Sequence, residues 1–367
     1  MILKKCSMEE FARRTQNKKI ICFGAYVMPV GMCNTYRELH LEERVVFLAD
    51  NDPHKQGQEF DLCGHSKKIL SPDELAGKAD SDTVILITSG YYVAIIEQLE
   101  QYRELEQVEC YVYPLMKSLY PSSGKVTVKH TENPLIPKKI HYFWFGGNEK
   151  PDILKRCIES WHRYCTDYEI TEWNESNYDV SKNRFVREAH REKKWAFVSD
   201  FARLDVIYDQ GGIYLDTDVE VIRPLDDLLY NESYFGLGNY GRINTGLGFG
   251  SVKGSSILKE LLGVYEGVSL YKKDGTLDLT TCTMRETPIF EKKGFVPEDR
   301  LQIVGNTVIF PAEVFSPNVP GTDINNLTEN TFSIHHNFFS WANEEEKRQY
   351  VESIRGTKAM IARMRED

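Results

Sequence analysis

The segment that most constrains the fold spans residues 195–223, where a helix, a Gly-Gly pair, a short strand and two aspartates follow one another. Apolar residues recur at helical spacing through its first half. Gly211 and the glycine after it supply the left-handed stop that ends a helix. Residues 213–215 then read as a short apolar strand, which is typical of a sheet covered on both faces. This order predicts an α/β fold in which Asp216 and Asp218 stand at the end of a buried strand.

This acidic pair has the composition of a cation site. Ligands of open α/β sheets lie beyond the carboxyl ends of the strands, and Mg²⁺ is usually held by one or two carboxylates together with substrate phosphates. We therefore expect Asp216 and Asp218 to hold Mn²⁺ or Mg²⁺ and, through it, a diphosphate. The alternative is a surface turn, where aspartate is common. Asp200 and Arg203, three residues apart on the preceding helix, either join the site or form a plain intrahelical ion pair.

Four ordered blocks resemble glycosyltransferase family 32, the DXD-containing sugar transferases that include many capsular-polysaccharide enzymes. The resemblance covers about residues 136–341, and its blocks are IPKKIHYFWFGG (136–147), CIESWHRYCTDYEITEWNESNYD (157–179), SDFARLDVIYDQGGIYLDTDVEVIRPLDDLL (199–229) and SIHHNFFSW (333–341). The family implies a GT-A fold, a nucleotide-sugar donor, Mn²⁺ or Mg²⁺, and retention of the anomeric configuration.

The resemblance also implies roles for residues around the acidic pair. Asp218 is expected to bind the metal directly, and Asp216 to contact the ribose, the sugar or the metal through water. Asp200 and Arg203 are expected to contact the transferred sugar. Tyr214 is expected at the ribose or phosphate, although it also reads as an ordinary sheet aromatic.

Other predicted donor contacts lie further from the pair. Trp144 lies at a strand end before two glycines, and the resemblance implies that it stacks on the nucleotide base; the alternative is a core aromatic. Asn244 is expected to line the sugar pocket, and residues 280–290 to face the sugar or the acceptor.

The closing block supplies the last predicted contacts. His335 and His336 are candidate metal ligands, and because neighbours in extended chain point in opposite directions, only one should face the metal. Ser340 and Trp341 are expected to close over the diphosphate as a lid would. The family's usual Gly-Ser-Trp ending reads Phe-Ser-Trp here, with Phe339 in place of glycine.

The first third of the chain alternates short apolar runs with helical stretches, for example residues 92–105, and this predicts a parallel Rossmann-like sheet. The spacing from Gly24 to Asp50 is similar to that of dinucleotide sites. However, the second glycine of that fingerprint is replaced by Tyr26. A scaffold without a nicotinamide cofactor is therefore favoured. An NAD-dependent sugar-modifying enzyme and a non-catalytic sugar-binding protein are the competing hypotheses.

The division expected for the 367 residues is a Rossmann-like domain (1–119), a linker (120–135), a GT-A catalytic domain (136–345) and a C-terminal helix (346–367). The formal charge of −10 argues against a nucleic-acid partner, since phosphate binding needs basic surface.

The eight cysteines form no CxxC pair, and neither a signal peptide nor a membrane-spanning run is recognisable. We expect an enzyme in a reducing cytoplasm or at the inner face of the cell membrane. Taken together, the sequence predicts a metal-dependent retaining enzyme. It would move a hexose from a nucleotide sugar, with UDP sugars favoured, to a glycan or lipid-linked saccharide in bacterial surface polysaccharide synthesis.

Overall fold

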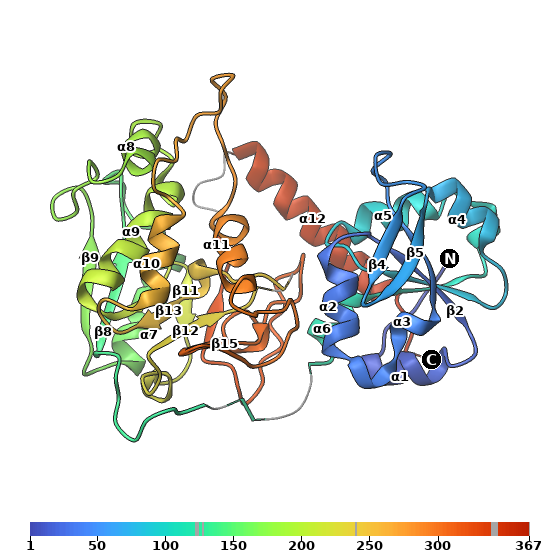
Figure 1. Cartoon of the computed structure of the whole chain (residues 1–367), viewed down its shortest axis with the longest axis horizontal. Helices are drawn as coiled ribbons and strands as arrows, with labels where there is room; N and C mark the ends of the chain where they lie inside the picture. The colour runs from blue at the N-terminus through green and yellow to red at the C-terminus, as the bar shows by residue number, and fades with distance from the viewer. Residues whose placement is uncertain (122–124, 127, 239–240, 339–343, 367) are drawn as a thin grey trace.

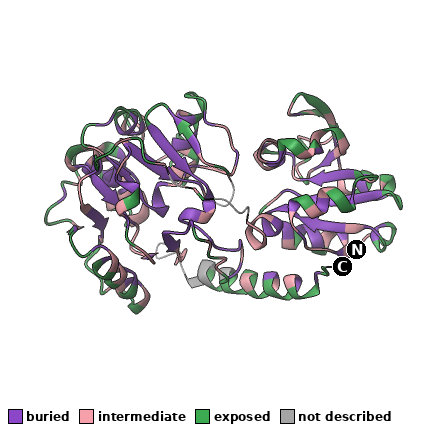
Figure 2. Cartoon of the chain, turned by 90° about the horizontal axis from the view of Figure 1, so that it is seen from below, coloured by how far each residue is buried: buried purple, intermediate pink, exposed green. Residues whose placement is uncertain are grey.

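The protein has two α/β parts, each built around its own seven-stranded sheet (Figure 1). The computed structural model describes the whole chain except residues 122–124, 127, 239–240, 339–343 and 367. In both parts the central strands of the sheet are buried, while edge strands such as β4 (Glu59–Leu62) and β9 (Glu169–Trp173) and the outer faces of the helices are more exposed (Figure 2).

The N-terminal sheet has the order β1-β7-β6-β2-β3-β5-β4, and its pairs are parallel except for the β4–β5 hairpin. Its strands are β1 (Ile2–Leu3), β2 (Lys19–Phe23), β3 (Val45–Ala49), β4 (Glu59–Leu62), β5 (His65–Leu70), β6 (Thr83–Ile87) and β7 (Glu109–Val112). From β2 the chain first builds one side of the sheet through β3 and later the other side through β6. The strand order therefore reverses between β2 and β6, which is where ligands of such sheets bind.

Helices cover both faces of this sheet because its strands are apolar on both faces. In β2, Ile20 and Cys22 face one core, whereas Ile21 and Phe23 face the other. The helices are α1 (Met8–Arg14), α2 (Val27–Thr35), α3 (Leu41–Arg44), α4 (Pro72–Lys78), α5 (Tyr92–Leu99) and α6 (Tyr113–Leu119), with 3₁₀ turns at Arg37–Leu39 and Arg103–Leu105.

The helix predicted over residues 92–105 is wrong in its length, because α5 ends at Leu99 and a separate 3₁₀ turn follows. Tyr102 between them is extended, and its hydroxyl donates to Asp73 Oδ1 at 2.6 Å. This tertiary bond competes with continued helix and is not visible in the helical pattern.

The second sheet is mixed, with the order β14-β15-β12-β13-β10-β8-β9. Its strands are β8 (Lys139–Phe143), β9 (Glu169–Trp173), β10 (Gly212–Tyr214), β12 (Ser233–Gly236), β13 (Phe249–Ser251), β14 (Gln302–Val304) and β15 (Thr307–Phe310). A separate two-stranded ribbon pairs β11 (Val219–Val221) with β16 (Ser333–His335). That ribbon joins the chain just after the acidic pair to the closing block.

The helices of this part divide between the two faces of the sheet. Trp161 on α7 packs in one core, and its indole Nε1 donates to Val219 O at 2.7 Å. The helices α8 to α11 pack in the core on the other face. The helices are α7 (Asp152–Tyr164), α8 (Arg184–Arg191), α9 (Trp195–Gln210), α10 (Ser256–Gly263) and α11 (Cys282–Glu291), with 3₁₀ turns at Asp226–Leu228, Thr245–Leu247 and Ala312–Val314.

The last helix, α12 (Glu344–Arg363), returns to the N-terminal part and lies against α5 (Figure 1). Met360 and Met364 join the same buried cluster as Tyr92. The chain therefore ends beside its own beginning, where Lys4 and Arg365 form a β-bridge.

Direct contacts also join the two parts. Gly31 on α2 meets the carbonyl of Pro297 so closely that a Cβ atom would overlap it. Nearby, Lys117 pairs with Asp299 at 2.9 Å.

The predicted α/β class, with a parallel Rossmann-like sheet in the N-terminal part, is confirmed by these topologies. The mixed second sheet is consistent with a GT-A type fold. Among the described residues, the structure contains no helix that is both long and apolar enough to span a bilayer.

Candidate active site

A tight helix-to-strand turn places the acidic pair. Helix α9 ends at Gln210 and is capped by Gly211, whose φ is 67°; Gly212 follows with φ 112°. A Cβ atom on Gly212 would lie 2.8 Å from the carbonyl oxygen of Lys139 on β8. Only glycine fits both the positive φ and this approach. The chain can thus enter β10 directly beside β8, and Asp216 lies two residues beyond the end of β10.

Asp216, Asp218 and His335 form a group that can hold a metal ion, with one ligand atom from each lying within 4.8 Å of the others. His335 Nε2 is 3.3 Å from Asp218 Oδ1 and 4.0 Å from Asp216 Oδ2. The register of the ribbon explains the meeting, since Val219 on β11 pairs with His335 on β16.

The other carboxylate oxygens of the pair are already in use. The Tyr214 hydroxyl donates to Asp216 Oδ1, and the backbone N–H of Phe338 donates to Asp218 Oδ2 at 2.8 Å. These bonds orient both carboxylates and leave Asp216 Oδ2, Asp218 Oδ1 and His335 Nε2 facing one another. Two carboxylate oxygens and one imidazole nitrogen fit Mn²⁺, because Mg²⁺ strongly prefers oxygen ligands alone.

The opposite charges within this group shift one another's pKa values. Burial alone would raise the pKa of Asp218, but the charge and hydrogen bond of His335 and the Phe338 N–H outweigh it and lower that pKa to about 2. Burial alone would lower the pKa of His335, yet the facing carboxylates raise it. The acids and the imidazole thus favour one another's charged forms, and a cation bound here would compete with protons for the same ligand atoms.

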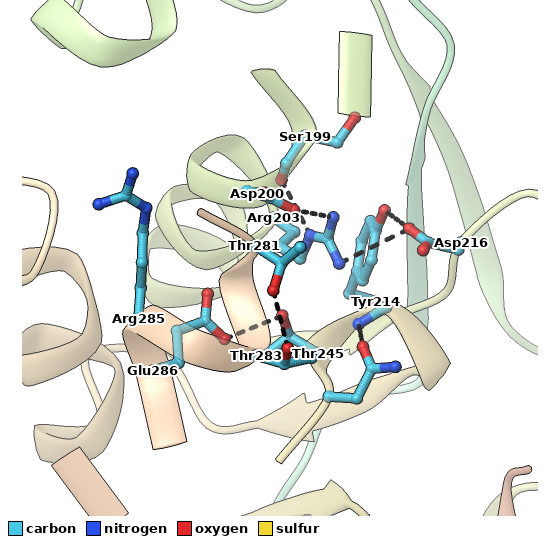
Figure 3. Close-up of polar contacts among 12 residues, drawn as sticks. Ser199, Asp200, Arg203, Tyr214, Asp216, Thr245, Thr281, Thr283, Arg285 and Glu286 are labelled. Atoms are coloured by element: carbon cyan, nitrogen blue, oxygen red, sulfur yellow. Dashed lines mark hydrogen bonds and ion pairs between the residues drawn. The ribbon is translucent and has the colours of Figure 1, made fainter. Parts of the chain in front are cut away.

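Asp200 and Arg203 extend the acidic pair into the interior (Figure 3). Arg203 Nη2 donates to Asp200 Oδ1 at 2.7 Å, and Arg203 Nη1 lies 3.7 Å from Asp216 Oδ1. Nη1 is buried and makes no hydrogen bond within the described part of the chain. Burial raises the pKa of Asp200 to about 6, even though the Arg203 charge lowers it. The two residues form the intrahelical pair, and Arg203 also carries positive charge to Asp216.

A further acid, Glu286 on α11, lies in the same buried region; it belongs to the segment 280–290 expected near the sugar or the acceptor, but the sequence did not single it out. Its carboxylate accepts hydrogen bonds from Thr245 Oγ1 and the Tyr265 hydroxyl, both at 3.0 Å. Complete burial, reinforced by the Asp200 charge, raises the pKa of Glu286 to about 8. The available signal was the spacing of Glu286 and Phe290, four residues apart on the buried face of one helix.

Asn244 lies near Asp216 of the acidic pair. Its Oδ1 accepts the N–H of Gly246 at 2.9 Å. A Cβ atom on Gly246 would stand 2.7 Å from Asp216 Oδ2, 3.1 Å from Asn244 Oδ1 and 3.3 Å from Arg203 Nη1. All three polar groups thus converge on one point that only glycine leaves open.

The remaining predicted residues are placed differently. Tyr214 is buried beside Asp216. The Cζ atom of the Arg203 guanidinium lies 4.9 Å from the centre of the Tyr214 ring. Trp144 is half-buried just beyond β8, and its Nε1 donates to Asn148 O at 2.6 Å. His336 does not join the ligand group, because its Nε2 bonds Glu220 Oε2 at 2.8 Å.

Two predicted lid residues, Ser340 and Trp341, lie outside the described residues.

Comparisons with known proteins bear on this same segment. Residues 151–235 match the family described as a glycosyltransferase sugar-binding region containing a DXD motif. A curated relative from Legionella pneumophila subsp. pneumophila, "Subversion of eukaryotic traffic protein A", is 25% identical over 122 residues, which cover 26% of this chain and 19% of that protein. The chain therefore spans about a fifth of that relative's length.

A solved structure, "PaToxG Glycosyltransferase", is 16% identical and aligns with a TM-score of 0.33 over 43% of this chain and 67% of its own. That likeness is too weak to carry an argument. The family match includes the α9 helix, β10 and both aspartates, so the segment that carries the acidic pair is similar to the sugar-binding region of DXD glycosyltransferases.

Proposed function

We propose that this protein is a metal-dependent, retaining glycosyltransferase that moves a hexose from a UDP sugar to a saccharide acceptor. The observation that carries the proposal is the meeting of Asp216, Asp218 and His335 at the end of β10, inside the segment that matches the DXD family. Mn²⁺ is the favoured ion because the group combines carboxylate and imidazole ligands.

The ion would be held by Asp218 and His335 with Asp216, and when bound it supplies positive charge to the diphosphate of the donor. Asp216 is kept in place by the Tyr214 hydroxyl, and Asp218 by the N–H of Phe338. Arg203 adds a second, permanent positive charge, and its unused Nη1 donor can reach an oxygen of the donor. Asp200 fixes the guanidinium for that task.

Trp144 would contact the donor from the side of β10 on which β8 lies. It stands just beyond β8, the parallel neighbour of β10, so both strands present their carboxyl ends to one edge. We assign its indole face to the nucleotide base.

The transfer exchanges one bond at the anomeric carbon for another. The C1–oxygen bond to the diphosphate breaks, and its electron pair leaves with the nucleoside diphosphate. The acceptor hydroxyl forms the new C1–oxygen bond on the same face, and its proton passes to the leaving phosphate oxygen. Asp200 is tied to Arg203 and Glu286 is fully buried, so neither is free to act as a covalent nucleophile.

We further place the reaction in bacterial surface polysaccharide synthesis, in the cytoplasm or at the inner face of the membrane. The donor-side test is hydrolysis of a panel of UDP and GDP sugars with and without Mn²⁺, comparing the wild type with Asp218→Asn. We expect Mn²⁺-dependent release of UDP that the substitution abolishes. UDP release that depends neither on Mn²⁺ nor on Asp218 would refute the metal-site proposal. A product of inverted configuration, or a trapped glycosyl-enzyme, would refute retention by same-face attack.

A further inference from the structure

A cavity of about 720 Å³ lies between the two parts of the protein. Its size falls within the roughly 300–1,000 Å³ of small-molecule sites. Its N-terminal wall includes Gly24, Thr88 and Ser89, which follow β2 and β6. These are the two strands between which the strand order reverses, so the cavity occupies the place where such sheets bind ligands.

The transferase wall of this interdomain cavity includes residues that neighbour the metal-binding group. Asn244 lines it, and the Oδ1 of Asn244 and Oδ2 of Asp216 both border the open point at Gly246. Asn337 also lines it, directly between His336 and Phe338, whose N–H groups donate to Asp218 O and Asp218 Oδ2. An acceptor hydroxyl must approach the sugar carbon beside the diphosphate, and this cavity opens next to the residues that flank the metal-binding group.

The N-terminal wall is not arranged for a dinucleotide. Asp50 Oδ2 already accepts from the Ala25 N–H at 3.0 Å and pairs with Lys55 Nζ at 3.1 Å. Tyr26 stands where a dinucleotide site needs a glycine so that the pyrophosphate can approach the chain. Its hydroxyl instead accepts from Arg242 Nη2 of the transferase part at 3.2 Å. The N-terminal wall of the cavity therefore contacts the transferase part at Tyr26.

The lining chemistry fits a saccharide. Hydroxyl and amide side chains, among them Ser89, Thr283 and Asn244, can bond sugar hydroxyls. Two tyrosines on the N-terminal wall, Tyr26 and Tyr91, are 56% and 83% exposed. Aromatic rings with a polar tip serve such mixed contacts, since an apolar face covers the C–H side of a sugar ring.

We propose that this interdomain cavity is the acceptor site, that it takes the end of a saccharide, and that the N-terminal part binds this acceptor through Ser89 and Tyr91. The inference rests on the proposed function, because an acceptor requires a donor. The contact of Gly31 with Pro297 and the packing of α12 on the N-terminal part join the two walls directly.

The test uses variants on the N-terminal wall. Ser89→Trp fills the cavity, and Tyr91→Ala removes an exposed ring without touching a core. Ser66→Trp, on the exposed β4–β5 hairpin outside the cavity, is the matched control. The probes are p-nitrophenyl hexosides and N-acetylhexosaminides. Their binding is measured by saturation-transfer-difference NMR, and their effect on UDP release from the donor sugar is measured with Mn²⁺.

We expect at least one glycoside to bind wild type and to increase UDP release. Ser89→Trp and Tyr91→Ala should weaken both by at least about tenfold, which corresponds to about 1.4 kcal/mol, whereas Ser66→Trp should behave as wild type. The proposal is overturned if no glycoside binds or if both cavity variants bind as wild type does. If wild type binds glycosides but releases no UDP from any donor, the proposed transferase activity fails while the saccharide site stands.

Discussion

Glu286→Gln should change the pH dependence of stability in a direction that the structure fixes. Glu286 is fully buried, and its pKa is raised by burial from 4.5 to about 8. Below pH 4.5 the carboxyl is protonated in both the folded and the unfolded chain, so its favourable contribution is fully present. As the pH rises towards 8, only the folded state keeps the proton, and stability is lost.

The size of the effect follows from the same two values. Each tenfold difference in proton affinity is worth about 1.4 kcal/mol, so the loss between these limits is on the order of 5 kcal/mol. Glutamine stays neutral and keeps an oxygen for the Tyr265 hydroxyl and an amide for Thr245. The variant should therefore gain stability relative to wild type as the pH rises.

The assay is urea unfolding of wild type and Glu286→Gln at matched pH values from about 5 to about 9. Glu291→Gln, exposed at the end of the same helix, is the control and should leave the curve of stability against pH unchanged. A difference in unfolding free energy between wild type and Glu286→Gln that stays constant across the range would refute the assigned burial and protonation of Glu286.

Three further substitutions test the site itself. His335→Ala should weaken Mn²⁺ binding, measured by calorimetry, by more than about tenfold, while His336→Ala keeps wild-type affinity; equal losses would contradict the assignment of the ligand. Arg203→Leu leaves Asp200 and Asp216 buried without their cation and should lower the unfolding free energy by about 3–5 kcal/mol, and a urea midpoint equal to that of wild type would argue against the buried pair. Gly246→Ala should reduce donor hydrolysis strongly in a folded protein, because its Cβ atom would stand 2.7 Å from Asp216 Oδ2; normal hydrolysis would show that the point at Gly246 is not part of the site.

Local sequence patterns predict much of this architecture because they act over short distances. The apolar run of β2 faces a core on each side, and such runs separated by helices indicate a covered parallel sheet. The Gly-Gly turn and the acids after β10 are equally local. Spacing also puts Asp200 and Arg203 on one side of α9, although it does not reveal that both are buried.

Features that depend on pairing across the chain could not be predicted in this way. Two histidines in tandem look alike in sequence, and the register of β11 with β16 alone decides that His335 meets the acids. Glu286 becomes part of the buried region only because α11 packs beside Thr245 and Tyr265. The interdomain cavity likewise exists only because the two parts meet.

The most direct test of the central claim is the position of Mn²⁺ in crystals grown with Mn²⁺ and UDP, located by anomalous scattering at the manganese edge. The account predicts one strong peak between Asp218, His335 and Asp216, next to the diphosphate of UDP. A peak elsewhere, for example at the exposed cluster of His40, Glu42 and Glu43, or no peak beside a bound UDP, would contradict it.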